Sequence, residues 1–251
     1  MAVMHSRQWS RAWLGRILIA MKTIGMIGGM SWESSVIYYQ IVNREVQKRV
    51  GGVSSAKTLM YSFDFGEMSA LQSAGKWAEA TDLMTTVGAT LSRGGADFVM
   101  ICCNTMHLMA DEVEKAARIP LLHIADPLGT KIRADGRKRI GLIGSRFTME
   151  DDRIIAGRLQ AKFGLDIVAP GDADRAIVDR VIQEELVRGR FLDTSRAAYR
   201  EVMAHLVAQG CEGIILGCTE IPLLVKPEDA TVPLYDSTTL HALAAVDRAL
   251  A

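Results

Sequence analysis

The 251-residue sequence has no excess of either charge, because its 29 Lys and Arg residues balance 29 Asp and Glu residues. The basic residues are scattered along the chain rather than gathered in a stripe. A protein that binds nucleic acid needs a basic surface to neutralise phosphates, so we expect no nucleic-acid partner. No apolar stretch approaches the roughly 20 residues of a membrane-spanning helix, so we expect no membrane partner.

Cysteine is scarce, with four residues in the chain and no Cys-x-x-Cys pair. So few cysteines do not make a disulfide scaffold, and their positions at predicted strand ends suit a reducing cytoplasm. Cys103 and His107 are four positions apart, but no further metal ligand occurs at a useful spacing. We therefore expect no metal site.

The glycine motifs of nucleotide-binding proteins are also missing, since neither Gly-x-Gly-x-x-Gly nor Gly-Lys-Ser/Thr occurs, and we expect no cofactor. Residues 28–34 (GGMSWES) follow an apolar run and open a predicted helix. A turn of this kind lets the backbone approach a small carboxylate. Ser145 and Thr148 lie in the equivalent turn of the second half, where they could bind a substrate. Trp32, Tyr38 and Tyr39 suit either the core, an interface or the walls of a site.

Residues 1–21 contain Arg7, Arg11 and Arg16 but no acidic residue. A signal peptide needs an unbroken apolar core, and Arg16 interrupts the run 14–20. We interpret residues 1–21 as a loose N-terminal extension or an early start codon, with an amphipathic targeting helix as the alternative.

Two pairs of segments repeat at nearly the same offset. Residues 95–105 (GADFVMICCNT) match residues 210–220 (GCEGIILGCTE), and residues 24–28 (IGMIG) match residues 140–144 (IGLIG). The first pair is about 115 residues apart, and in each member a cysteine ends an apolar run. The repeat predicts two similar halves with one thiol on each wall of a shared cleft.

Short apolar runs alternate with longer amphipathic segments, which is typical of a parallel sheet covered by helices, the α/β class. We predict strands over residues 22–27, 59–63, 98–102, 121–124, 139–143, 166–169, 213–216 and 233–235. We predict helices over residues 34–49, 77–92, 106–117, 150–163, 174–188, 194–208 and 239–250. Parallel sheets bind ligands beyond the carboxyl ends of their strands, where both cysteines fall.

Cys103 and Cys218 are the candidate catalytic residues. Each precedes a predicted helix start, where exposed backbone N–H groups can stabilise a thiolate and lower the thiol pKa from its usual value of about 8.5. Racemisation without a cofactor needs a base on one face of Cα and an acid on the other, and two thiols can exchange these roles. Cys102 and Cys211 are expected to be small core residues.

Four segments resemble the aspartate/glutamate racemase family of cofactor-independent amino-acid racemases. They are residues 27–34 (IGGMSWES), 103–107 (CNTMH), 123–126 (HIAD) and 217–224 (GCTEIPLL). The resemblance extends from Met21 to the C-terminus and is most specific at the two thiol motifs.

The resemblance implies two similar α/β domains, each a parallel sheet flanked by helices, related by a pseudo-twofold axis with the active site between them. The first domain would comprise residues 22–118 and 229–251, and the second residues 119–228. The family's catalytic pair falls on Cys103 and Cys218. Its substrate contacts fall on Met30, Gln72, Asn104, Thr105, Thr219 and Glu220.

The resemblance further implies a homodimer, an amino-acid substrate and, because Cys103 is not replaced by threonine, turnover in both directions. Several relatives carry a substrate-facing lysine in the second half, but no lysine lies between Lys162 and Lys226 here. Arg175 is the nearest cation that might replace it.

Three functions remain open from the sequence. The preferred one is a two-thiol amino-acid racemase specific for aspartate and glutamate or broader in specificity. The second is a maleate isomerase or hydantoin racemase of the same superfamily. The third is a small-molecule binding protein that has lost turnover.

Overall fold

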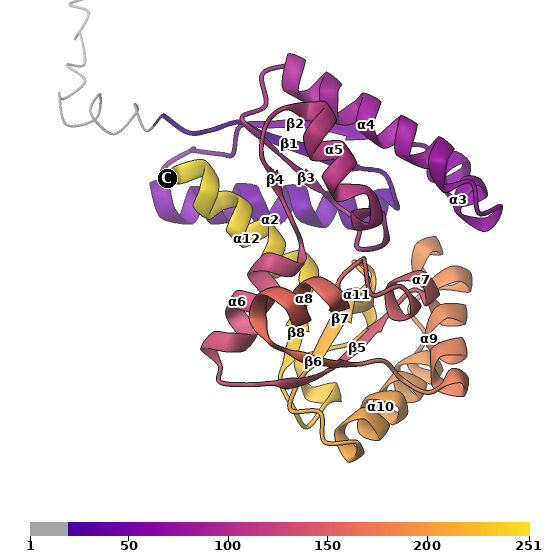
Figure 1. The fold of residues 1–251 in the computed structure, drawn as a ribbon. Coiled ribbons are helices and arrows are strands. Elements are labelled where there is room, and N and C mark those ends of the chain that lie inside the picture. The colour runs from indigo at the N-terminus through magenta and orange to yellow at the C-terminus, as the bar shows by residue number, and fades with distance from the viewer. Residues whose placement is uncertain (1–19) are drawn as a thin grey trace, which may run out of the picture.

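A computed structural model describes residues 20–251, which form two parallel four-stranded sheets flanked by helices (Figure 1). The first sheet contains β1 (Ile24–Gly28), β2 (Thr58–Ser62), β3 (Phe98–Ile101) and β4 (Leu121–Leu122). The second contains β5 (Arg139–Gly144), β6 (Asp166–Val168), β7 (Ile214–Gly217) and β8 (Leu234–Asp236). All eight predicted strands are present, with ends shifted by at most two residues.

The two sheets have the same strand order, β2-β1-β3-β4 and β6-β5-β7-β8. The repeated segments of the sequence therefore occupy equivalent positions, since β1 matches β5 and β3 matches β7. Each cysteine-bearing strand lies next to the first strand of its half, and every pairing is parallel. Parallel pairing brings the carboxyl ends of neighbouring strands to one edge of the sheet.

Each sheet is buried on both faces, and the alternation of side chains along a strand decides which residue faces which core. Phe98, Met100 and Cys102 pack in the cluster shared with α2 (Trp32–Val50). Val99, Ile101 and Cys103 face the opposite cluster, which α4 (Trp77–Arg93) completes. Fully burying one such aliphatic side chain contributes about 1.5–3 kcal/mol, so a single register is strongly favoured.

The remaining helices cover the sheets or connect the strands. They are α3 (Phe65–Ser73), α5 (Ala110–Ala117), α6 (Ala125–Ala134), α7 (Arg146–Glu150), α8 (Ala156–Phe163), α9 (Asp172–Glu184), α10 (Asp193–Ala208), α11 (Ile221–Leu224) and α12 (Ser237–Leu250). Three short 3₁₀ helices also occur, at Thr105–Met109 (η1), Leu186–Arg188 (η2) and Pro227–Asp229 (η3). None of the helices within residues 20–251 is long and apolar enough to cross a membrane.

Four helices of the described residues were not predicted, namely α3, α6, α7 and α11. Gly66 lies in the first turn of α3, and α6 contains both Pro127 and Gly129, residues that usually mark turns. The predicted helix over residues 150–163 starts too early, because α8 begins at Ala156 and Glu150 is the last residue of α7.

The chain crosses between the halves later than the expected boundaries at 118/119 and 228/229. β4 pairs with β3 and so belongs to the first sheet, while β8 pairs with β7 and belongs to the second. After β8 the chain returns, and α12 packs beside α2 in the first half (Figure 1). These crossings follow from strand pairing.

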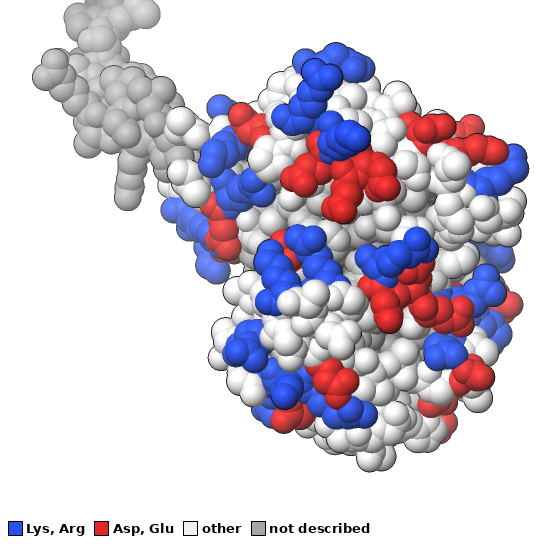
Figure 2. Space-filling model, viewed as in Figure 1, with Lys and Arg blue, Asp and Glu red and all other residues white. Residues whose placement is uncertain are grey.

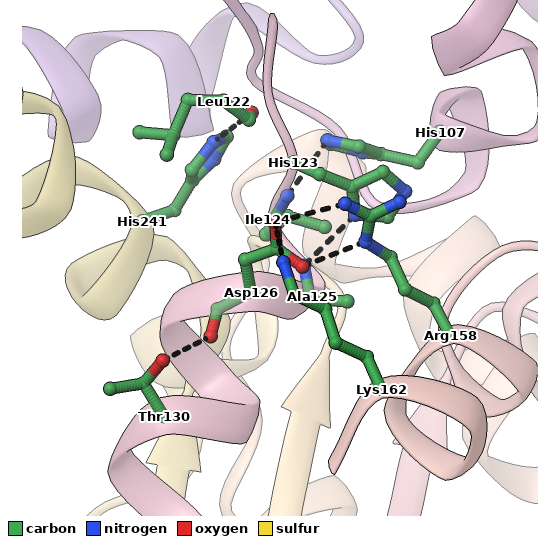
Figure 3. A network of polar contacts seen from close by, with 10 residues as sticks. All are labelled: His107, Leu122, His123, Ile124, Ala125, Asp126, Thr130, Arg158, Lys162 and His241. Carbon is green, nitrogen blue, oxygen red and sulfur yellow. Dashed lines mark hydrogen bonds and ion pairs between the residues drawn. The ribbon is translucent and has the colours of Figure 1, made fainter.

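Three buried histidines gather where the two crossing segments meet (Figure 3). The ring centroid of His107, in η1, lies 4.6 Å from that of His123, which follows β4, and 5.7 Å from that of His241 in α12. Asp126, in α6, accepts two hydrogen bonds from Arg158 and one from Lys162, so α6 is held against α8.

All three rings are neutral, because each uses one nitrogen as a hydrogen-bond acceptor. His107 Nδ1–H donates to the carbonyl of Cys103, and its Nε2 accepts from the N–H of Ile124. His123 Nδ1 accepts from the N–H of Ala125. His241 Nδ1 accepts from the hydroxyl of Tyr38, while its Nε2–H donates to a carbonyl. Burial lowers the pKa of His107 to about 4 and of His241 to about 3, and it lowers that of His123 further.

Elsewhere the charged residues are at least partly exposed and of mixed sign, except for the buried Glu185, Glu220 and Asp229. Figure 2 shows Lys and Arg beside Asp and Glu over the face in view, without an extended patch of one sign. Pairs such as Arg49 with Glu45 stabilise the fold only weakly, because exposed ion pairs are screened by water and salt.

Because of the histidine cluster, we predict that the free energy of unfolding falls on acidification at pH values above those at which most carboxylates titrate. The unfolded chain takes up protons near pH 6.5, whereas the buried rings do not until about pH 4 or below, so stability falls as pH falls. The loss between pH 6.5 and pH 5 is at most about 2 kcal/mol per buried histidine. Urea unfolding across this range measures it.

His241→Gln keeps one donor and one acceptor but cannot take up the proton, so its stability should fall less steeply with decreasing pH. The matched control is His205→Gln, which removes an exposed histidine paired with Asp174. Equal slopes for His241→Gln and wild type would contradict the prediction.

Candidate functional site

The two candidate thiols line one cavity at the carboxyl ends of equivalent strands. Cys103 follows β3 in the first half, and Cys218 follows β7 in the second. The cavity has a volume of about 40 Å³ and receives side chains from both halves. Its lining comprises Met30, Phe65, Gln72, Cys103, Asn104, Thr105, Ser145, Phe147, Ile182, Gln183, Val187, Gly217, Cys218, Thr219 and Glu220.

All eight site residues predicted from the sequence therefore lie around the same cavity, while their roles remain predictions. The lining residues that were not predicted belong mainly to α3, α7, α9 and η2, and they are Phe65, Phe147, Ile182, Gln183 and Val187. These residues belong to no recognisable sequence motif. An apolar residue on an amphipathic helix is normally assigned to the hydrophobic core. Only the packing of these helices across the strand ends places them here.

Glu220 is a buried carboxylate that joins the two halves at this cavity. It is 2% exposed, and its Oε2 accepts hydrogen bonds from the Cys218 thiol at 3.0 Å and the Thr219 hydroxyl at 3.0 Å. Its Oε1 accepts from the Ser31 hydroxyl, in the first half, at 2.8 Å. A buried carboxylate needs such donors, since burial without them costs several kcal/mol. Ser31 was missed as a site residue, although it lies in a quoted motif.

The predicted lowering of the thiol pKa values by a helix start was wrong for the empty cavity. Burial raises the pKa of Cys103 to about 12, although the backbone N–H groups of Met106 and Thr105 at the start of η1 lower it in part. Burial also raises the pKa of Cys218, and the adjacent Glu220 carboxylate raises it further. Both thiols are therefore protonated at neutral pH.

Asn104 presents an unpartnered acceptor. The Ser237 hydroxyl donates to the carbonyl of Leu216 at 2.7 Å, so toward Asn104 it can only accept, and it accepts from the Asn104 amide nitrogen at 3.1 Å. This fixes the orientation of the side chain. Asn104 Oδ1 is buried without a hydrogen-bond partner among the described residues. Together with Glu220, it gives the cavity two acceptors for a cationic group.

Three hydroxyls bridge the halves beside Cys103. Thr105 Oγ1 lies 2.9 Å from Ser145 Oγ and 3.2 Å from Thr148 Oγ1, and the latter two are 3.1 Å apart. Ser145 also caps α7. Because hydroxyl hydrogens rotate, this group can redirect a donor toward a bound carboxylate.

The turn over residues 28–34 holds the site but has few free donors for a carboxylate. The N–H of Gly29 donates to Ser35 Oγ at 2.8 Å, and the N–H of Ser31 points toward Glu220. Gly29 has φ of +85°, and a Cβ there would lie 2.3 Å from the backbone of Phe63. Only glycine allows this approach, which places Met30 against the cavity. Tyr38 packs in the core, while Trp32 and Tyr39 are exposed.

Arg175 does not line the cysteine cavity. It lies in a neighbouring cavity of about 400 Å³, where it pairs with Asp172 and lies 3.7 Å from Glu150. The expectation that Arg175 replaces the lysine of some relatives therefore receives no support from its position. Gln183 lines both cavities, so the larger one lies just outside the site.

Cys102 and Cys211 are fully buried core residues, as predicted. His107 is bonded to the backbone of Cys103 and Ile124 and so does not act with Cys103 as a ligand pair. Within residues 20–251, no group of three or more His, Cys, Asp or Glu side chains is placed to hold a metal ion.

The Asp/Glu/Hydantoin racemase model matches residues 27–245. The chain belongs to this family. Among solved structures, a Yersinia pestis protein assigned to the Asp/Glu racemases is 48% identical, with a TM-score of 0.85 over 92% of this chain and 100% of that one. An aspartate racemase homologue from Pyrococcus horikoshii is 30% identical, with a TM-score of 0.78 over 91% of this chain and 99% of that one.

Relatives with curated names in the Asp/Glu/Hydantoin racemase family are more distant. A glutamate racemase from Pseudomonas paraeruginosa is 26% identical over 83% of this chain and 75% of its own length. The broad specificity amino-acid racemase RacX from Bacillus subtilis is 21% identical over 64% of this chain and 68% of its own length. Family membership supports a racemase-type enzyme, and the relatives differ in the substrates for which they are named.

The raised thiol pKa values predict slow alkylation of the free protein. With few thiolates at pH 7.5, iodoacetamide should modify Cys103 and Cys218 far more slowly than a free cysteine, and the rate should still rise above pH 9. Mass spectrometry of the digested protein at a series of pH values measures each site. A Cys103 rate that levels off at about pH 9.5, one unit above the usual thiol pKa of about 8.5, would show an ordinary thiol.

Proposed function

We propose that the protein is an amino-acid racemase that works without a cofactor and uses Cys103 and Cys218 as its two proton-transfer groups. The observation that supports this most directly is one cavity lined by a thiol from each half. Racemisation requires an acid and a base on opposite faces of one carbon, and two similar groups serve both directions. The mechanism needs reduced thiols, which a cytoplasmic location provides.

An amino-acid substrate would bring a positive charge to the cavity, whose described lining residues include no basic side chain. The Glu220 carboxylate and the unpartnered Asn104 Oδ1 are the acceptors that the ammonium group of an amino acid would use. A positive charge beside the thiols favours the thiolate and so opposes the effect of burial on their pKa values. As the substrate binds, one thiol releases its proton to solvent, and the resulting thiolate then faces Cα.

The chemical step removes a proton from one face of Cα and adds a proton to the opposite face. One thiolate takes the Cα proton and becomes a thiol, while the electron pair left on Cα delocalises into the carboxylate. The other thiol gives its proton to the opposite face, so the two sulfurs end with exchanged protonation states. Thr219 donates its hydroxyl proton to Glu220, so the hydroxyl group of Thr105, Ser145 and Thr148 is the better donor for the carboxylate.

Replacing either thiol should stop racemisation. Cys103→Ala and Cys218→Ala are each expected to lower kcat at least 100-fold, because positioned acid–base groups contribute about 10²–10⁴-fold. Cα exchange of L-amino acids in deuterated water, followed by NMR and chiral chromatography, measures the loss.

Cys102→Ala and Cys211→Ala are the matched controls, since both remove a buried thiol outside the cavity. They should retain activity at temperatures where they remain folded. Near-full activity of either cavity variant would rule out the pair.

The same experiments separate the other candidate functions. A maleate isomerase uses one cysteine as a nucleophile, and maleate would then leave a succinyl adduct on that cysteine, detectable by mass spectrometry. A hydantoin racemase would exchange deuterium into a 5-substituted hydantoin but not into free amino acids. A binding protein without turnover would bind an amino acid yet give no exchange.

A further inference from the structure

We infer that the cavity selects amino acids with uncharged side chains and discriminates against aspartate and glutamate. This inference rests on the proposed racemase function and concerns the charge balance of the same site. The preference among substrates follows from the charged groups that the described residues place around the two thiols and from those that are absent there.

The cavity contains one acidic side chain and no basic one. Among the described residues that line it, Glu220 is the single carboxylate, and neither lysine, arginine nor histidine occurs. Glu220 is bonded to Ser31, Cys218 and Thr219, all of which are uncharged groups. The empty site therefore has an uncompensated negative charge in a buried position.

The position of Glu220 determines which group of the substrate it binds. Its Oε2 is 3.0 Å from Cys218 Sγ, and a reacting carbon must lie roughly 3–3.5 Å from the thiol that exchanges its proton. The ammonium group attached to that carbon therefore lies close to Glu220. One ammonium balances one carboxylate, and the substrate α-carboxylate then binds to hydroxyl and backbone donors.

A second substrate carboxylate has no counterion in this arrangement. A buried carboxylate is stable when it is paired with a cation or held by several donors. Aspartate or glutamate would bring an additional negative charge close to Glu220, which repels it. Asparagine and glutamine have nearly the same shape as these acids and carry no such charge.

The cations of the larger neighbouring cavity make contacts of their own outside the site. Arg175 and Arg180, in the larger neighbouring cavity, are paired with acidic residues, and Arg146 is exposed and stacks over the Phe147 ring. That cavity has four acidic residues against three arginines, so it offers no net positive charge. Gln183 is the residue at the boundary between the two cavities.

The wall available to a substrate side chain is neutral. It consists of apolar residues from both halves and two amides, namely Phe65, Phe147, Ile182, Val187, Gln72 and Gln183. Gln72 Nε2 points to the sulfur of Met106 at 3.0 Å, a weak acceptor that a substrate oxygen can replace. Such a wall accepts apolar and amide side chains.

Amide and acid pairs of equal shape test the inference. Glutamine against glutamate, and asparagine against aspartate, are compared by Cα–deuterium exchange with the full-length wild-type protein. We expect kcat/KM at least 10-fold higher for an amide than for its acid, and measurable exchange of methionine and leucine. Glutamate or aspartate exchanging as fast as its amide would overturn the inference while leaving the racemase function intact. Lysine exchanging faster than the neutral amino acids would also overturn it. Exchange of no amino acid at all would overturn the racemase function itself.

A charge added at the boundary gives an independent readout. Gln183 is exposed in α9, so Gln183→Lys should fold and should place a cation at the mouth of the cavity. We expect it to reduce the glutamine-to-glutamate ratio of kcat/KM at least fivefold. Gln160→Lys, on an exposed position of α8 away from the cavity, is the matched control and should leave the ratio unchanged. Equal ratios for both variants and wild type would count against an electrostatic origin of the selectivity.

Discussion

The Glu220 carboxylate is the group on which the site depends. It is buried, it accepts from Ser31 of the first half, and it accepts from Cys218 and Thr219 of the second. These contacts hold the two halves in register across the cavity. They also hold the Cys218 thiol in one position, because the sulfur donates to the same carboxylate. The described lining residues place no cation beside this charge.

The thiol pKa values follow from the same arrangement. Burial favours the neutral thiol at both Cys103 and Cys218, and the Glu220 charge opposes thiolate formation. Protonated thiols resist oxidation and alkylation, since the thiolate is the reactive form of cysteine.

The histidine cluster where the two crossing segments meet lies close to Cys103. His107 links the carbonyl of Cys103 to the N–H of Ile124, where the chain crosses into the second half. Its ring packs at an angle against those of His123 and His241 (Figure 3). The position of the first thiol is thus tied to the packing of both crossing segments. Neutral imidazoles suit this role, because each presents one donor and one acceptor in a fixed direction.

The sequence by itself determined the α/β class, the duplication and the two thiols, while the six other predicted residues that meet at the cavity came from its family resemblance. Hydrophobic periodicity and the repeated thiol motifs are local, and parallel strands bring their carboxyl ends together whatever else the chain does. Only the tertiary structure decided the crossings after β4 and β8, the position of Arg175 outside the cavity and the protonation of the thiols. These features depend on which helices cover the strand ends and on how much water the helices exclude. Burial and the distances between residues remote in sequence cannot be inferred from the local sequence.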